Sequence, residues 1–129
     1  MTDVKVVDAS AAAALLFGEA EAERVANELA GARLLAPALI DFELANVCVV
    51  KSRRRPDQRD AYIAALRLRE RIGIEQVAVE SDAVATLALD AGLSAYDASY
   101  LWLAEQLGAQ LVTLDAKLAR ASAERARRD

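Results

Sequence analysis

The segment AQLVTLDAKLARA (Ala109–Ala121) changes character in its middle, where the short apolar run QLVTL gives way to an acid and then to a helical pattern. A short run rich in apolar and β-branched residues favours a strand, and the Ala, Leu, Lys and Arg residues after Asp115 favour a helix. The same order occurs in VKVVD (Val4–Asp8), which precedes an Ala-rich helical segment. We therefore predict two strands that each end in an acid and lead directly into a helix.

The rest of the chain alternates in the same way. Two more strands are predicted, RLLA (Arg33–Ala36) and IEQVAV (Ile74–Val79). Helices are predicted from about Ser10 to Phe17, before Gly31, from Pro37 to about Arg54, from Pro56 to Gly73, from Ser81 to Gly92, from Ser94 to Gly108 and after Asp115. Strands that alternate with helices form a parallel sheet covered on both faces. The prediction is one α/β domain over residues 1–129, a three-layer α/β/α sandwich with a mostly parallel sheet of four to five strands.

The composition excludes several kinds of site. The chain has no His and one Cys, Cys48, so Ser-His-Asp and Cys-His nucleophiles, zinc sites of the usual ligands and disulfides are ruled out. The formal charge of −4 makes the whole chain a poor polyanion binder, and any nucleic acid would need a local basic patch and a metal. The start, MTDVKVVDAS, does not resemble a secretory signal, and no stretch is long and apolar enough for a membrane. We expect a cytoplasmic protein that does not bind membranes.

Four acids are expected at one edge of the sheet. Asp8 and Asp115 follow the first and last strands, and sites in open parallel sheets form outside the carboxyl ends of the strands. Glu43 and Asp97 lie in the first turns of the helices that are expected to open at Pro37 and Ser94. Each acid also has a simpler structural interpretation. Asp8 and Asp115 can be helix N-caps, SAYD (residues 94–97) is close to a capping box, and Glu43 can be an exposed helical charge.

Together the four acids favour a metal site. Two carboxylates about 4 Å apart repel each other by roughly 4 kcal/mol at an effective dielectric constant near 20. The group must therefore protonate or bind a divalent cation. Without His or Cys ligands, a hard ion that prefers oxygen is indicated, Mg²⁺ or Mn²⁺, and Mg²⁺ often pairs with substrate phosphates. Asp41, next to the helix start, and Asp90 remain alternative members of the site.

Four motifs in register resemble the PIN-domain ribonucleases, and among them the VapC toxins of bacterial type II toxin–antitoxin pairs. They are VVDAS (residues 6–10), APALIDFELANV (36–47), GLSAYDASYLWLAEQLGA (92–109) and LVTLDAKLA (111–119), which together cover nearly the whole chain. The resemblance implies a PIN-like fold and metal-dependent hydrolysis of RNA phosphodiesters that leaves a 5′-phosphate and a 3′-hydroxyl. It also implies an antitoxin that inserts a segment into a groove near the acids, where an Arg could cap the carboxylates, and a homodimer.

The resemblance also implies roles for particular residues. Asp8, Glu43, Asp97 and Asp115 would be the catalytic quartet that binds Mg²⁺ or Mn²⁺. Ser10 and Thr113 match polar positions that support the site. Asn46 matches the Asn of the E-x-x-N pattern of these toxins. The alternative interpretation of Asn46 is that it forms an ordinary hydrogen bond of a helix. Some relatives carry a further acid where this chain has Ala116 and Lys117. We therefore expect one ion, held by Asp8 and Asp97, with Glu43 and Asp115 acting partly through water.

A basic cluster lies at the far end of the helix that carries Glu43. It comprises Lys51, Arg53, Arg54 and Arg55, with Arg59 nearby. Such a cluster can bind RNA phosphates, or it can be a solvated helix end whose cations complement the helix dipole. We expect most of these charges to be solvated and one or two Arg side chains to touch RNA. The large apolar residues near the acids are expected mainly in the core, namely Leu39, Phe42, Tyr62, Trp102 and Leu103.

Two other functions stay open. A receiver domain of a signalling protein has a similar length and architecture. It would need two adjacent acids after the first strand and an Asp after the third, whereas this chain has a lone Asp8 and Glu80. The second alternative is a catalytically silent PIN fold that only binds RNA or protein. The complete set of four acids argues against it, and a cleavage assay separates the two.

Overall fold

The computed structural model describes residues 3–128 and contains one sheet of four parallel strands. The strands are β1 (Val4–Val7), β2 (Arg33–Pro37), β3 (Ile74–Val77) and β4 (Gln110–Val112), in the order β3-β2-β1-β4. Val6 in the centre of β1 is paired with Leu35 on one side and Leu111 on the other. The predicted α/β class is confirmed, and the sheet, predicted to be mostly parallel with four to five strands, has four strands that are all parallel.

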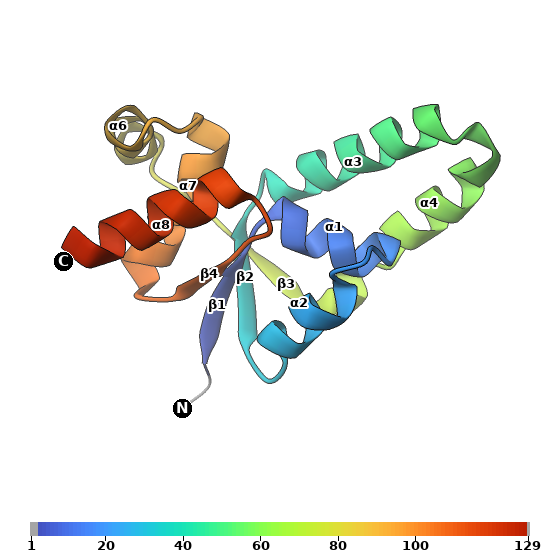
Figure 1. Ribbon diagram of the computed structural model, residues 1–129, viewed down its shortest axis with the longest axis horizontal. Helices are drawn as coiled ribbons and strands as arrows, with labels where there is room; N and C mark the ends of the chain where they lie inside the picture. Colours follow the sequence, from blue (N-terminus) through green and yellow to red (C-terminus); the bar gives the residue numbers. More distant parts are fainter. Residues whose placement is uncertain (1–2, 129) are drawn as a thin grey trace.

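Helices cover both faces of this sheet. Between β1 and β3 lie α1 (Ala9–Phe17), α2 (Ala22–Leu29), α3 (Ile40–Arg54), the 3₁₀ turn η1 (Pro56–Gln58), α4 (Arg59–Arg67) and α5 (Arg69–Ile72). Between β3 and β4 lie α6 (Ser81–Ala91) and α7 (Ala95–Leu107), and α8 (Ala116–Arg128) follows β4. The chain moves in one direction from β1 to β3 and then returns to β4, so right-handed crossovers place the two sets of helices on opposite faces. Figure 1 shows α6, α7 and α8 on one side of the sheet and α1 to α4 on the other.

The core forms where α7 packs against β1 and β2 and where α1 packs against its neighbouring helices. Ala11, Ala12 and Ala14 of α1 are fully buried, and their small side chains let this helix pack closely against α2, α3 and α4. Leu103 is buried as expected, but the prediction for Phe42 is wrong, because 80% of its surface is exposed. The buried side of α3 carries Ile40, Leu44 and Cys48, every fourth residue. Phe42 is two residues from Ile40, about 200° around the helix, and therefore points away from the core.

The helix that contains Glu43 begins later than predicted. Pro37 is the last residue of β2, where it is paired with Val77, and α3 begins only at Ile40. Proline is compatible with an extended backbone as well as with a helix start, and at a strand end its missing N–H removes at most one ladder hydrogen bond. The pairing of β2 with β3 therefore continues through Pro37. Glu43 still lies in the first turns of α3.

The single helix predicted from Pro56 to Gly73 is divided into η1, α4 and α5. The division between α4 and α5 falls at Leu68, whose backbone N–H bonds to the carbonyl of Ala65 at 3.0 Å, as in a 3₁₀ turn. Beyond this point the Arg69 guanidinium lies 2.7 Å from the Asp41 carboxylate and donates to the carbonyl of Ile74. Contacts with α3 and β3 thus accompany a break that the local sequence does not signal.

Smaller differences concern the ends of elements. β3 ends at Val77 rather than Val79, and β4 ends at Val112, which leaves Thr113 outside the ladder. Glu80, not Ser81, is the N-cap residue of α6. Gly92 has a φ of +67°, a conformation that favours glycine, and it ends α6 two residues before the N-cap of α7. These ends decide which side chains reach the edge of the sheet.

The pair α3 and α4 extends away from the sheet as a helical hairpin (Figure 1), and we call residues 40–67 the arm. Within the described residues, no helix combines the length and the apolar character needed to cross a membrane.

Candidate active site at the carboxyl edge of the sheet

Asp8 is held by three donors in the turn between β1 and α1. Its Oδ1 accepts a hydrogen bond from the backbone N–H of Ala11 at 3.0 Å, which makes Asp8 the N-cap of α1, and another from Ser10 at 2.7 Å. Its Oδ2 accepts a hydrogen bond from the Thr113 hydroxyl at 2.5 Å. Only 5% of Asp8 is exposed. Burial raises the pKa of this carboxyl above its usual range, although the three hydrogen bonds act in the opposite direction and the charge of Asp115 adds to the rise.

Ser10 and Thr113 join the two turns at the ends of β1 and β4. The Ser10 hydroxyl donates to Asp8 and accepts the backbone N–H of Leu114 at 2.9 Å. The Thr113 hydroxyl donates to Asp8 and accepts the backbone N–H of Asp115 at 3.0 Å. Each hydroxyl can donate one hydrogen bond, and both Ser10 and Thr113 donate it to the Asp8 carboxylate. The two side chains therefore fix the orientation of the Asp8 carboxylate and connect it to the last strand.

Glu43 reaches the same edge from α3 and is held by Tyr100 of α7. The Tyr100 hydroxyl donates to Glu43 Oε1 at 2.6 Å, and only 1% of Tyr100 is exposed. Burial, and then the neighbouring carboxylates, keep the pKa of Tyr100 far above its usual range, so the phenol stays protonated and acts as a donor. Burial also raises the pKa of Glu43; the hydrogen bond from Tyr100 opposes this, and the charges of Asp97 and Asp8 add to it.

Asp97 and Asp115 lie at the starts of α7 and α8. Ser94 is the N-cap of α7 and accepts the backbone N–H of Asp97 at 3.1 Å, as the SAYD pattern predicts. The Oδ1 of Asp115 accepts the backbone N–H of Leu118 at 3.0 Å, so Asp115 caps α8. Burial raises the pKa of Asp97, the charge of Asp115 raises it further, and Lys117 lowers it. The capping interpretations of Asp8 and Asp115 are correct, and both acids also belong to the electrostatic cluster.

The four acids therefore influence one another across the edge of the sheet. Glu43 is affected by Asp8 and Asp97, and Asp115 affects both Asp8 and Asp97. As the side chains stand, no three Asp, Glu or Cys residues within residues 3–128 are arranged so that they could hold a metal ion. The chemistry of the donors does suit a hard cation, because carboxylate and hydroxyl oxygens are the ligands that Mg²⁺ and Mn²⁺ prefer. Burial is the largest cause of the raised pKa values of Asp8, Glu43 and Asp97, and neighbouring carboxylates add to the rise; a divalent cation would offset that negative charge.

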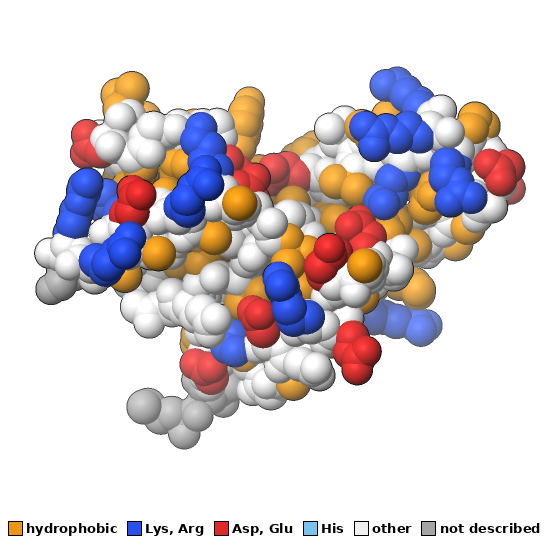
Figure 2. Space-filling model, in the orientation of Figure 1, with side chains coloured by type: hydrophobic (Ala, Val, Ile, Leu, Met, Phe, Trp, Pro, Cys, Tyr) orange, Lys and Arg blue, Asp and Glu red, His pale blue; other side chains and the backbone are white. Residues whose placement is uncertain are grey.

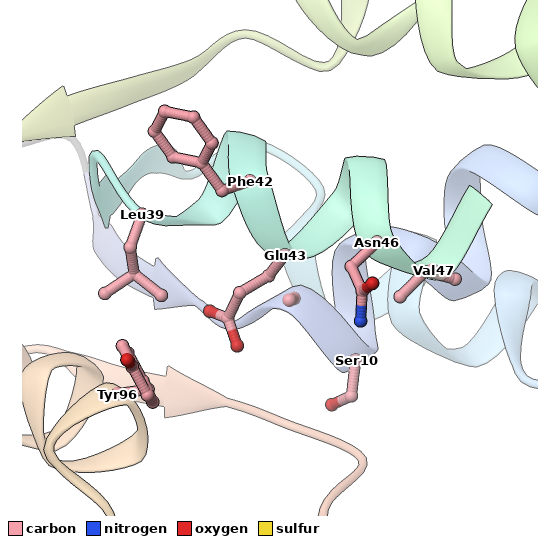
Figure 3. A pocket seen from close by; sticks show the side chains of 8 residues that line it. Ser10, Leu39, Phe42, Glu43, Asn46, Val47 and Tyr96 are labelled. Carbon is pink, nitrogen blue, oxygen red and sulfur yellow. The ribbon is translucent and has the colours of Figure 1, made fainter. Parts of the chain in front are cut away.

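A cavity of about 590 Å³ opens beside the acids, between α3 and the start of α7. Glu43 and Ser10 belong both to the cavity and to the acidic cluster. Asn46, one turn after Glu43, points toward Ser10, whereas Glu43 and Leu39 extend toward the side where Tyr96 lies (Figure 3). Asn46 is exposed, and its amide lies on the cavity wall.

The two alternative acids have other environments. Asp41 forms an ion pair with Arg69 at 2.7 Å and accepts a hydrogen bond from Gln76. It thus connects α3 to α5 and β3. Asp90 is exposed in the last turn of α6 and does not line this cavity. Neither residue is among the groups that raise the pKa values of Asp8, Glu43 and Asp97.

The basic cluster of the arm divides into two kinds of residue. Lys51 forms an ion pair with Glu19 at 3.2 Å and lies over the rings of Phe17 and Tyr62. Arg53, Arg54 and Arg55 are exposed. Figure 2 shows Lys and Arg side chains gathered over the arm and, on the other side of the molecule, over α8. Lys51 is therefore part of the packing of the arm, and the three Arg side chains are accessible.

Tyr100 was missed by the sequence prediction. It lies three residues after Asp97 in α7, and positions three apart face the same side of a helix. That spacing was the available signal, but an aromatic residue inside YLWLAEQL is also typical of a core. Its hydroxyl becomes significant only because the fold brings it within hydrogen-bond distance of Glu43 in α3.

Comparison with known proteins places this architecture and site in one class. The family model of the PIN domain matches residues 5–124, and the chain belongs to that family. It is 39% identical over 118 residues to Ribonuclease VapC9 of Mycobacterium tuberculosis strain H37Rv, with 88% of this chain and 87% of that protein covered. It is 38% identical over 120 residues to Ribonuclease VapC3 of Pyrobaculum aerophilum, with 88% and 91% covered.

A solved structure has the same fold. The crystal structure of PAE2754 from Pyrobaculum aerophilum superposes with a TM-score of 0.76 at 27% sequence identity. The match covers 92% of this chain and 79% of that chain. The predicted family resemblance is thus confirmed by both sequence and structure.

Proposed function

We propose that this PIN-domain protein is an endoribonuclease that depends on Mg²⁺ or Mn²⁺ and acts as the toxin of a type II toxin–antitoxin pair. The observation that carries the proposal is the convergence of four carboxylates from four separate elements, with Asp8 buried and held by three hydrogen bonds. A buried, oriented carboxylate that interacts with Asp115 and Glu43 is costly to the fold and is better explained by function than by packing. The names of the VapC relatives support RNA as the substrate.

In this proposal the chain's own residues have distinct tasks. Asp8, Glu43, Asp97 and Asp115 would hold Mg²⁺ or Mn²⁺, which supplies Lewis-acid charge for hydrolysis of a phosphodiester. Ser10 and Thr113 fix both oxygens of Asp8, and Tyr100 fixes Glu43. Asp97 or Asp115 orients the attacking water. Because the chain has no His, a route through the RNA 2′-hydroxyl lacks its usual acid and base groups.

RNA must approach a site that is itself negatively charged. The exposed Arg53, Arg54 and Arg55 supply positive charge on the arm, and Arg–phosphate contacts would offset part of the repulsion. Lys51 is not assigned to RNA, because its ammonium group is already engaged with Glu19 and two rings.

Asp97→Asn is the test of the proposed activity. We expect it to lower metal-dependent cleavage of RNA by about 100-fold or more, the scale of a positioned catalytic acid or base, without loss of the folded state. Cleavage is followed on gels with Mg²⁺ or Mn²⁺ and with excess EDTA, and folding by circular dichroism. Asp90→Asn, which removes the same charge from the exposed end of α6, is the matched control and should retain activity. Full activity of Asp97→Asn, or of the wild type in EDTA, would contradict the proposal.

A catalytically silent PIN fold that only binds RNA or protein remains the alternative. It is favoured by the observation that no three of the described acids are arranged to hold a metal as their side chains stand. The same experiment separates the two functions, because a silent module binds RNA without metal-dependent cleavage in the wild type.

Two protein partners belong to the proposal. An antitoxin would cap the acids with an Arg side chain, and a second copy of the chain would form a homodimer. The exposed apolar side chains Val49, Val50 and Ile63 on the arm are candidates for a surface between copies. Light scattering of the purified protein should give twice the mass of one chain, and a monomer at micromolar concentration would contradict the homodimer.

A further inference from the structure

Two aromatic residues each immediately precede an acid of the cluster. Phe42 comes before Glu43 in α3, and Tyr96 comes before Asp97 in α7. Successive residues of a helix point about 100° apart, so the acid faces the sheet edge while the aromatic residue faces outward. Phe42 is 80% exposed and Tyr96 is 67% exposed. Such exposure gives the fold little stability, and both rings border the cavity beside the acids.

The cavity between them combines apolar walls with a polar side. Leu39, Phe42 and Tyr96 form apolar wall, and Ser10, Glu43 and Asn46 supply hydroxyl, carboxylate and amide groups. Figure 3 shows Asn46 pointing toward Ser10, with the Glu43 carboxylate between these two side chains and Tyr96. A flat ligand with an apolar face and a polar edge fits this division.

We propose that the cavity binds a nucleobase of the RNA strand whose phosphodiester lies at the acids, with Tyr96 as the stacking face, Phe42 as the outer wall and Asn46 as a polar contact for the base edge. This inference rests on the proposed ribonuclease function and names a substrate subsite for it. It assigns Tyr96, Phe42 and Asn46 to positioning and selection of RNA, not to the chemical step.

Continuity with the acids favours a nucleobase as the occupant. Ser10 and Glu43 line the cavity and also belong to the acidic cluster, so a strand bound at the acids brings the base attached to its neighbouring ribose to the cavity. Charge favours the base as well. The cavity wall contains Glu43 and no Lys or Arg, so a second phosphate is disfavoured there, whereas a neutral base is not.

The polar groups argue against an apolar peptide segment. Such a segment would desolvate the Asn46 amide and the Glu43 carboxylate oxygen that Tyr100 does not contact without replacing their hydrogen bonds to water, which costs free energy for each group. A base edge carries both donors and acceptors, and an Asn amide can pair with it through both of its own. Stacking on one exposed aromatic ring supplies the remaining affinity.

The test compares RNA with and without one base. The cut is first mapped in an oligoribonucleotide that the wild-type protein cleaves, and each nucleotide next to the cut is then replaced in turn by an abasic one. Dissociation constants are measured by fluorescence anisotropy with Mg²⁺ in the Asp97→Asn protein, in which cleavage should be about 100-fold slower or more. We expect one abasic position to weaken binding by about 5- to 100-fold, the scale of one stacked base. When Tyr96→Leu is added to Asp97→Asn, intact RNA should bind about as weakly as the abasic RNA binds to the protein with Asp97→Asn alone. The same abasic position should then weaken binding no further.

Two further variants separate stacking from general damage. Tyr96→Phe keeps the ring and should restore the dependence on the base, whereas Tyr96→Leu keeps only apolar bulk. Leu89→Ala removes another exposed apolar side chain, 85% exposed on α6 and outside the cavity, and should behave as the parent protein. If Tyr96→Leu distinguishes abasic from intact RNA as the parent does, the inference is overturned, even though cleavage by the wild type upholds the function. If the wild type cleaves no RNA, the proposed function fails, and the inference fails with it.

Discussion

The turn that carries Asp8 and the arm differ in how far their charged side chains are exposed to solvent. Asp8 is buried, and backbone and hydroxyl donors from both adjoining turns hold its two oxygens. On the arm, Arg53, Arg54 and Arg55 are exposed to solvent. Exposed charges contribute little to stability, whereas a buried anion is costly unless its hydrogen bonds are kept. The turn at Asp8 therefore fixes the orientation of one carboxylate and lowers the stability of the fold. The arm supplies positive charge with little effect on stability.

Thr113→Val is the substitution that should affect this contrast most. It keeps the shape of the side chain but removes the donor to Asp8 and the acceptor for the Asp115 N–H. We expect a loss of about 1–3 kcal/mol in the free energy of unfolding, the usual cost of leaving a buried charged group without one partner. Thr86→Val is the control, because the exposed Thr86 hydroxyl donates only to the carbonyl of Asp82 in its own helix. Urea denaturation measures both variants.

The loss from Thr113→Val should also depend on pH. Burial raises the pKa of Asp8 in the folded protein, so the stabilising effect of its proton is complete below the unfolded pKa and is lost as pH rises through the folded one. Removing a donor to the charged carboxylate raises the folded pKa further. The variant should therefore lose more stability at pH 7 than below the ordinary Asp pKa of 3.8, both in EDTA. Equal losses at the two pH values would show that the hydroxyl does not stabilise the carboxylate.

The arm is tested by a comparison of Lys51→Ala with Arg54→Ala. Both substitutions should have smaller effects on stability than Thr113→Val. Lys51→Ala removes a half-buried ion pair and contacts with two rings, so the free energy of unfolding should fall by about 0.5–1 kcal/mol. Arg54→Ala should change stability by less than about 0.5 kcal/mol and should lower by about one the slope of RNA affinity against salt. Thermal unfolding and a salt titration of RNA binding provide the two measurements. If Lys51→Ala lowered the salt slope of RNA affinity and Arg54→Ala did not, RNA binding would be assigned to Lys51.

The sheet edge was largely predictable from sequence, for a physical reason. A strand, an acid and a helix in succession place the acid at a helix N-terminus, where its side chain has a local backbone donor. Asp8 and Asp115 follow this rule, Asp97 is placed by the N-cap Ser94 three residues before it, and parallel strands bring their carboxyl ends to one edge. That these acids bind metal and cut RNA remains a prediction.

The features that the sequence did not reveal depend on contacts between distant elements. Phe42 differs from its buried neighbours only in its angle around α3. Tyr100 gains its partner because the fold brings α7 to Glu43 of α3, and Lys51 contacts Glu19 and one ring each from α1 and α4. Pro37 is compatible with a strand end and with a helix start, and the pairing with β3 decides between them.

The hydrogen bond between Thr113 and Asp8 joins residues 105 positions apart. A ribosome makes Asp8 first, so the growing polypeptide cannot close this contact until β4 and the turn after it have emerged. A product of premature termination before Thr113 lacks both the clamp on Asp8 and the acid at position 115. If the protein is the toxin we propose, its cell meets the harmful activity only after synthesis has passed this point, and interrupted translation yields fragments without a working centre.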